Sequence, residues 1–214
     1  MNIHDVYRPI LRHFRTKRIR RFYELLGVDS GTRILDVGGN GFFWRIAGEL
    51  NLPKPREITI LNIYDQNEDL PDGVTWVRAD ARAMPFTDNQ FDVAFSNSVI
   101  EHLETAANQT AMAFEIRRVA RMYWVQTPDP RFPVEPHYIT PFIHWLPDSV
   151  RRHVSRNGTV WGIITRPTPQ EVDARLKEIR LLSPKEFRNL FPDARIVIER
   201  FAGLPKSMVA VRRG

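Results

Sequence analysis

The feature that most constrains the fold is a short apolar segment that runs directly into a cluster of glycines. Residues 33–37 predict a buried β-strand, and Gly38-Gly39-Asn40-Gly41 follows at once. Residues 42–50 then carry apolar side chains at helical spacing. A strand, a glycine turn and a helix in this order suit an open α/β sheet that binds a nucleoside cofactor at the carboxyl edge of its strands.

Further strand-like segments follow, separated by lengths suited to crossover connections. We expect strands at residues 57–63, 74–78, 91–96 and 122–126, a helix over 105–121, and a final hairpin of strands at 194–201 and 207–212. This order predicts a Rossmann-like, seven-stranded, mostly parallel sheet with an antiparallel last strand and helices on both faces. The turn at 202–206 is short enough for an antiparallel hairpin.

Two segments flank or interrupt this pattern within what we expect to be one domain, residues 1–214. Residues 4–26 predict an amphipathic, strongly basic helix, and residues 1–29 are expected to cap the cofactor site. Residues 128–180 are expected to form an inserted lid on the acceptor side, and the many prolines of 128–169 predict an irregular structure there. A helix opened by Ser183, Pro184 and Glu186 follows the insertion.

The composition excludes some chemistries and limits the cellular location. The chain has no cysteine, so disulfides, thiolate zinc sites and cysteine nucleophiles are excluded. Its longest apolar runs have the length of strands, and no apolar leader follows the first basic residues, which predicts a cytoplasmic protein. Lys and Arg number 31 against 25 Asp and Glu, a net charge of +6 that is concentrated near the N-terminus. Peripheral contact with an anionic membrane is therefore a second expectation.

Polar side chains recur where successive predicted strands end. Asn62 follows the second strand, Asp80 the third, and Ser96 ends the fourth. In a doubly wound sheet these ends converge on one crevice, so the sequence predicts that these residues share a ligand site with the glycine turn.

The motifs at these positions resemble those of the class I S-adenosylmethionine (SAM)-dependent methyltransferases, in the type 11-like subgroup that has small-molecule and lipid acceptors. The resemblance covers roughly residues 30–127 and returns in the final hairpin. It rests on three segments: Ile34-Leu35-Asp36-Val37-Gly38-Gly39-Asn40-Gly41, Arg78-Ala79-Asp80-Ala81 with Met84-Pro85-Phe86, and Phe91-Asp92-Val93-Ala94-Phe95-Ser96-Asn97 with Ile100-Glu101-His102-Leu103.

The resemblance implies a role for each cofactor residue. The backbone from Gly38 to Gly41 should lie against the methionine part of SAM, with Asp36 supporting the loop or reaching the cofactor amino group. Asp80 would accept a hydrogen bond from the adenine amino group, and the Ala81 amide would face the ring.

Two positions depart from the family pattern. Asn40 stands where the family usually has glycine, and we expect it to take a left-handed backbone, which Asn tolerates. Asn62 stands where an acid usually holds the ribose hydroxyls, so cofactor affinity is expected to be weaker unless Asp65 takes that role. A nicotinamide dehydrogenase is disfavoured, because its glycine pattern would place glycine at positions 38, 40 and 43.

The acceptor site is predicted beside the fourth and fifth strands. His102 is a candidate general base or an ordering residue for its loop, and the proline-stiffened segment after the fifth strand offers Glu135, His137 and Tyr138. Methyl transfer needs the acceptor held in line, and a base only where a proton is hard to lose. These residues lack a recognised metal-ligand spacing, so no metal is expected.

Three functions remain open at this point. The first is a methyltransferase with a small-molecule or lipid-like acceptor; the second is an RNA methyltransferase, since the basic helix could contact phosphates; the third is a non-catalytic SAM-binding protein. The second is weakened because Ser96-Asn97-Ser98-Val99 is unlike the motif of amino-methylating nucleic-acid enzymes. The acceptor, the methylated atom and the oligomeric state are not predicted.

Overall fold

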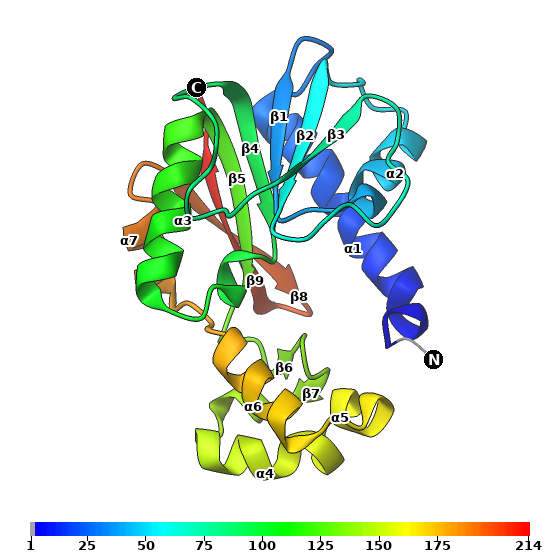
Figure 1. Cartoon of the computed structure of the whole chain (residues 1–214), viewed down its shortest axis with the longest axis vertical. Helices are drawn as coiled ribbons and strands as arrows, with labels where there is room; N and C mark the ends of the chain where they lie inside the picture. Colours follow the sequence, from blue (N-terminus) through cyan, green and yellow to red (C-terminus); the bar gives the residue numbers. More distant parts are fainter. Residues whose placement is uncertain (1–2) are drawn as a thin grey trace.

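A seven-stranded sheet forms the centre of the molecule (Figure 1). The computed structural model describes residues 3–214, and the side chains of residue 12 and of 14–214. The sheet has the order β3-β2-β1-β4-β5-β9-β8. Its strands are β1 (Arg33–Val37), β2 (Glu57–Asn62), β3 (Val74–Arg78), β4 (Phe91–Asn97), β5 (Ala120–Pro128), β8 (Arg195–Phe201) and β9 (Leu204–Arg212). β9 pairs antiparallel with both β5 and β8, whereas β1 to β5 pair in parallel, so the predicted sheet is confirmed.

Helices cover both faces of the sheet, as predicted. α1 (Ile3–Leu26) and α2 (Gly41–Glu49) lie on one face, and α3 (Ala106–Val119) and α7 (Pro184–Leu190) lie on the other (Figure 1). Ser183 caps α7 in the predicted capping box with Glu186, and Pro184 occupies the first turn. A short 3-10 helix, η1 (Ile100–His102), follows β4.

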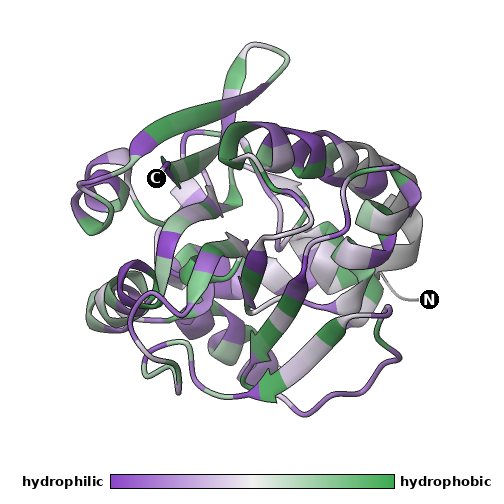
Figure 2. Cartoon of the chain, turned by 90° about the horizontal axis from the view of Figure 1, so that it is seen from above, coloured by the Kyte–Doolittle hydropathy of each residue, from purple (hydrophilic) through white to green (hydrophobic). Residues whose placement is uncertain are grey.

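Each face of the sheet has its own hydrophobic core. On the α1 and α2 face, Phe22 and Phe43 pack around Phe95 with ring centroids 4.8 and 4.5 Å away. On the other face, Ile116 and Phe187 pack against the opposite side of β4 and β5. The strands carry mostly hydrophobic residues and the helices alternate hydrophobic with hydrophilic ones (Figure 2). Burial of both faces explains why the inner strands read as continuous apolar runs.

The inserted segment after β5 is irregular up to residue 147, as expected, but it is helical from residue 148 on, where our expectation of an irregular structure was wrong. It contains β6 (Val134–Glu135), β7 (Thr140–Pro141), η2 (Ile143–Trp145), α4 (Asp148–Gly158), α5 (Val160–Thr165) and α6 (Pro169–Glu178). Its helices avoid interior prolines: Pro147 precedes α4, and Pro169 is the first residue of α6, where its missing N–H costs nothing. The lid has a small core of its own around Tyr138 and Trp161.

The hairpin between β8 and β9 is tighter than predicted. β8 ends at Phe201 as predicted, but β9 begins at Leu204 and not at residue 207, so that Ala202 and Gly203 alone form the turn, with φ values of 47° and 80°. Two successive residues with positive φ match the primed turn that suits the twist of paired strands.

α1 confirms the predicted N-terminal helix. The side chain of Leu11, which helical spacing places on the same face as Phe22, lies outside the described residues, whereas Ile19 and Phe22 are buried against the sheet. None of the helices within residues 3–214 combines the length and apolar composition needed to cross a membrane.

Candidate active site

The glycine turn after β1 is built so that two of its residues cannot carry a side chain. Gly38 has a φ of +75°, and a Cβ there would lie 2.6 Å from Val99 Cγ1. A Cβ on Gly39 would lie 1.9 Å from the Asp36 carboxylate. The turn therefore presents bare backbone at the carboxyl end of β1, which suits the close approach of a nucleoside cofactor.

Asn40 has a different role from the one we predicted. Its backbone is extended, with φ −149° and ψ 166°, and its side-chain oxygen accepts a hydrogen bond from Phe42 N (3.1 Å), so it is the N-cap of α2. The left-handed residue of the turn is Gly38. Asn is among the preferred N-cap residues, which gives a physical reason for the departure from glycine.

Asp36 lies beneath the turn and is almost completely buried. Its Oδ2 accepts a hydrogen bond from the Trp44 indole N–H (2.7 Å), and its Oδ1 has no partner among the described residues. Burial raises the pKa of Asp36 to about 7, against the lowering effect of the Trp44 hydrogen bond. The carboxylate thus joins β1 to α2, and its two predicted roles, supporting the loop or reaching the cofactor amino group, stay predictions.

Asn62 connects the end of β2 to the same turn. Its Nδ2 donates to Gly39 O (3.0 Å) and its Oδ1 accepts from Tyr64 N (3.2 Å). Asp65 forms an exposed ion pair with Arg78. Contact of Asn62 with the ribose stays a prediction.

Asp80 and Ser96 lie at the ends of β3 and β4, as predicted from the sequence. Asp80 accepts hydrogen bonds from the Arg82 backbone and guanidinium, which hold the pKa of the carboxyl below its usual range. Ala81 follows in a turn. The buried Ser96 hydroxyl donates to Val37 O (3.1 Å) and joins β4 to β1. The adenine and cofactor contacts of these residues stay predictions.

Two predicted acceptor-site residues, His102 and His137, meet at the carboxyl ends of β4 and β5. Their Nε2 atoms are 3.1 Å apart. His102 Nδ1 lies 2.7 Å from Glu178 Oε1, and His137 Nδ1 lies 2.5 Å from Glu135 Oε1. Glu101 completes the group, which we call the histidine cluster: Glu101, His102, Glu135, His137 and Glu178.

The histidine cluster is adjacent to the glycine turn and joins the lid to the sheet. Val99, whose side chain packs on Gly38, accepts a hydrogen bond through its carbonyl from His102 N (2.9 Å). The Arg180 N–H, just after α6, donates to Glu101 O (2.7 Å). The cluster therefore lies where an acceptor beside the cofactor would lie.

The charges of the histidine cluster support one another. Burial disfavours the charged form of Glu135, but hydrogen bonds from the His137 ring and from the His137 and Tyr138 backbone outweigh it and lower the pKa of Glu135. Burial likewise opposes the charged form of His137, yet the carboxylates of Glu135 and Glu101 raise its pKa. Glu135 thus positions His137 and holds its Nδ1–H.

Tyr138 packs in the core of the lid. Its ring lies edge-on against Trp161, with centroids 5.6 Å apart, and burial raises its pKa to about 12. A role for Tyr138 in the chemistry stays a prediction. Glu101 and Glu178 were missed: Glu101 adjoins His102 in the sequence, whereas no signal marked Glu178, which the lid brings in from 76 residues away.

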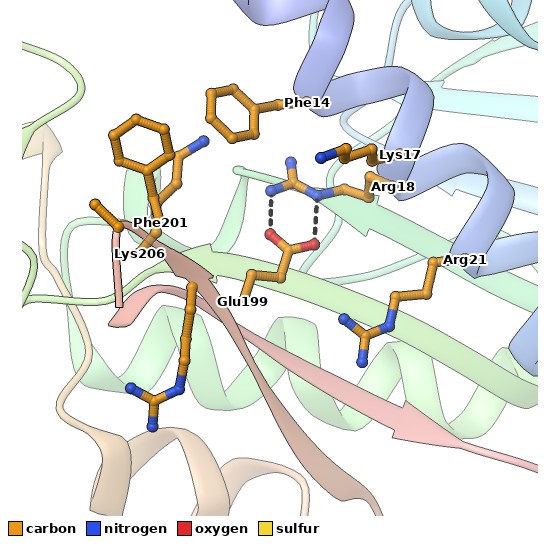
Figure 3. A pocket seen from close by; sticks show the side chains of 9 residues that line it. Phe14, Lys17, Arg18, Arg21, Glu199, Phe201 and Lys206 are labelled. Carbon is orange, nitrogen blue, oxygen red and sulfur yellow. Dashed lines mark hydrogen bonds and ion pairs between the residues drawn. The ribbon is translucent and has the colours of Figure 1, made fainter. Parts of the chain in front are cut away.

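A basic cavity of about 290 Å³ lies between α1 and the β8–β9 hairpin (Figure 3). Its lining includes Phe14, Lys17, Arg18, Arg21, Glu199, Arg200, Phe201 and Lys206. Arg18 is buried and pairs with Glu199, and its Nη1 also donates to Asn97 Oδ1 (2.5 Å) at the end of β4. The cavity is thus joined to the same edge of the sheet as the histidine cluster.

Comparison with known proteins relates part of the sequence to one family and the fold to solved structures. Residues 35–122 match the family model described as a methyltransferase domain, and a search of curated sequences gave no match. The fold is similar to a SAM-dependent methyltransferase of Archaeoglobus fulgidus (TM-score 0.55, 14% identity, 94% of each chain). It is also similar to a methyltransferase of Haloferax volcanii solved with the activator Trm112 (TM-score 0.53, 14% identity, 95% of this chain and 91% of that one).

A protein of Anabaena variabilis described as a methyltransferase of antibiotic biosynthesis has the same fold (TM-score 0.55, 18% identity, 86% of this chain). The chain spans 64% of that protein's length. The matched residues 35–122 include most of β1, the glycine turn and all of β4. These elements lie in the middle of the seven-stranded sheet. Residues 35–122 thus carry the match to a methyltransferase domain, and the fold around them is that of the solved SAM-dependent methyltransferases; SAM is the cofactor that this family implies.

Proposed function

We propose that this methyltransferase modifies a lipid-like acceptor that carries an anionic group, with the reacting atom beside His102 and His137. The observation that carries the proposal is the basic cavity at the same edge of the sheet as the histidine cluster, because its lining combines cations with aromatic rings. An acceptor with an apolar body and an acidic head matches that combination.

A row of aromatic side chains leads from α1 to the lid. Phe14 and Phe201 are in edge-on contact at 5.6 Å, and Phe201 contacts Phe132 at 6.3 Å. On the lid, the rings of Phe142 and Trp145 are 5.1 Å apart, and each residue is 53% exposed. Adjacent exposed aromatic rings are a favourable surface for an acyl or prenyl chain or for the interface of a membrane.

The cations of the cavity supply the complementary charge. Glu199 neutralises Arg18, whereas Lys17 and Arg21 are exposed on α1 and Arg200 lies on the hairpin. Lys206 lies over the Phe14 ring at 3.0 Å, and burial, followed by the charge of Arg18, lowers its pKa to about 8. At neutral pH these side chains favour a phosphate or carboxylate on the acceptor.

The residues of the site divide the work of methyl transfer. SAM supplies a methyl group on a sulfonium centre. The bare backbone at Gly38 and Gly39 fits the cofactor, and Asp80 would bind its adenine. His102 and His137 hold the acceptor's reacting group, while the lid and the aromatic row exclude water and fix its direction.

Methyl-labelled SAM would identify the acceptor class. The protein is incubated with a lipid extract in detergent, a deproteinised aqueous extract and total RNA from its source organism. We expect label in the lipid fraction. Replacing Phe142 and Trp145 with serine should lower that transfer about 10-fold or more, because each aromatic side chain that an acceptor covers contributes about 1.5–3 kcal/mol.

Phe114→Ser is the matched control, since Phe114 is exposed on α3, away from the cavity. Label confined to the aqueous extract would contradict the lipid-like acceptor, and label confined to RNA would favour the nucleic-acid alternative.

A further inference from the structure

Two imidazole nitrogens of the histidine cluster face each other without a described group between them. His102 Nε2 and His137 Nε2 are 3.1 Å apart, while each Nδ1 faces a carboxylate. A carboxylate accepts hydrogen bonds, so each Nδ1 carries the ring hydrogen. In a neutral ring the Nε2 then has a lone pair. The two lone pairs therefore lie close together, and a cation or a proton between the two Nε2 atoms would relieve their repulsion.

Glu101 adds a third donor atom to that place. Its side chain is fully buried; Oε2 accepts a hydrogen bond from the Thr127 hydroxyl (3.0 Å), and Oε1 has no partner among the described residues. Buried carboxylate oxygens almost always have a partner, so this orphan oxygen requires an explanation. A proton shared between the two imidazoles would satisfy them and leave Glu101 Oε1 unpartnered.

We propose that Glu101, His102 and His137 bind a divalent transition-metal ion. One ligand atom from each of the three residues lies within 4.8 Å of the others. Two nitrogens bound to one ion at 2.0–2.1 Å and at angles of 90–109° are about 2.8–3.4 Å apart, and the observed separation of 3.1 Å falls in that range. Two histidines and one carboxylate leave coordination positions open, as in catalytic sites of zinc and iron.

Glu135 and Glu178 complete the site from outside. Metal-bound histidines usually donate their other N–H to a carboxylate or carbonyl, which fixes the ring and raises its basicity as a ligand. Both histidines have that partner here. The sequence predicted no metal because these ligands come from η1 and from the lid, 35 residues apart, and no local spacing marks them.

The inference deepens the proposed function and rests on it for the location of the acceptor. An ion at this place would take an acceptor oxygen in an open position and lower the pKa of its hydroxyl. The ion binds to the protein whether or not the acceptor is lipid-like, so the two proposals can be tested apart.

Metal binding is measured on the full chain after chelator treatment, without SAM or acceptor. Co²⁺ is followed by its visible absorption and Zn²⁺ by calorimetry. We expect one ion per chain. His102→Ala and Glu101→Gln should weaken binding about 100-fold or more, and Glu178→Gln about 10- to 100-fold, the range for an outer-sphere partner.

His153→Ala is the matched control, because His153 is exposed on α4 and outside the cluster; its binding should equal that of the wild type. The side chains of His102 and Glu178 are 30% and 43% exposed, so these two variants test the site even if Glu101→Gln does not fold. Absence of Co²⁺ and Zn²⁺ binding, or equal binding by His102→Ala, would overturn the metal site. Methyl transfer that persists without metal would leave the proposed function standing, whereas metal binding without transfer to lipid would overturn the acceptor alone.

Discussion

The carboxyl of Asp36 makes stability depend on pH. Its folded pKa of about 7 lies above the unfolded value of about 3.9, so the unfolded chain ionises first as the pH rises. The contribution of this group to stability therefore falls between about pH 4 and pH 7 and stays low above that range.

Asp36→Asn should remove this dependence and keep the hydrogen bond from Trp44. We expect the variant to be more stable than the wild type at pH 8 and to lose that advantage at pH 5, as measured by urea unfolding at both values. An equal difference between the two proteins at both pH values would show that Asp36 does not titrate in this range.

His137 is expected to act in turnover and not in cofactor binding. His137→Ala should lower kcat about 100-fold or more, whether the ring is a base or a ligand, because either role acts at the reacting group. The Kd for SAM, measured by calorimetry, should stay within about twofold. A variant with normal kcat on the true acceptor would show that the ring is a structural part of the lid.

Asp80 tests the adenine assignment. A carboxylate that accepts from the adenine amino group contributes about 1.5–3 kcal/mol, so Asp80→Ala should weaken SAM binding about 10-fold or more. Asp88→Ala, at an exposed carboxylate paired with Arg118, is the control. Equal affinity of both variants would remove the assignment.

Positions were easier to predict than orientations at this scale. Asp36, Asp80 and His102 could be located because each follows an apolar strand, and parallel strands bring their ends together. The roles of Asn40 and Tyr138 depended on backbone conformation and on the direction of a side chain. An extended backbone makes Asn40 a cap, and the lid core takes the Tyr138 ring; neither effect is visible in spacing.

Among the elements, α1 is more than a charged surface helix. Arg15 stacks on the Phe42 ring at 4.8 Å, and Arg18 forms a buried pair with Glu199 that ties α1 to β8. Arg18→Gln should therefore destabilise the protein by about 3 kcal/mol, since it removes the ion-pair partner of the largely buried Glu199 carboxylate.

Lys17→Gln and Arg21→Gln are the matched controls on the same helix. Both side chains are exposed, and we expect changes of about 0.5 kcal/mol or less in the same urea experiment. If all three variants unfold at the same urea concentration, the Arg18 pair contributes nothing to the stability of the folded chain.

The lid shows why prolines were a poor guide to this element. Proline cannot continue a helix, but it suits the residue before a helix or the first helical turn. Pro169 lies in the first turn of α6, and Thr168 with Glu171 forms a capping box there. The number of prolines predicted an irregular segment. A proline that directly follows an N-cap residue such as Thr168 instead marks the start of a helix.

At the scale of the whole molecule, the cavity cations and exposed aromatic rings predict binding to anionic membranes. The protein should cosediment with vesicles that contain anionic phospholipid and less with neutral vesicles, and added salt should release it. Replacing Lys17, Arg21 and Lys206 together with Gln should weaken binding about 10-fold or more, because each cation near such a surface contributes about 1 kcal/mol.

Lys54→Gln is the control, since the exposed Lys54 precedes β2 and so lies near the amino ends of the parallel strands, whereas the cavity lies at the carboxyl ends. Equal binding to neutral and anionic vesicles would contradict the electrostatic part of this prediction.

The contacts between lid and sheet have a thermodynamic consequence. Glu178 meets His102, the Arg180 N–H meets Glu101 O, and Arg175 Nη2 donates to His137 O (3.1 Å), so the lid is held through the residues that form the site. Occupancy of the site and closure of the lid therefore share one coupling free energy, and the coupling is reciprocal. A ligand of the histidine cluster that shifts the lid toward its closed position by some factor binds the closed form more tightly by the same factor. Substitutions in α6 that touch no substrate should therefore change the affinity of the histidine cluster for its ligand.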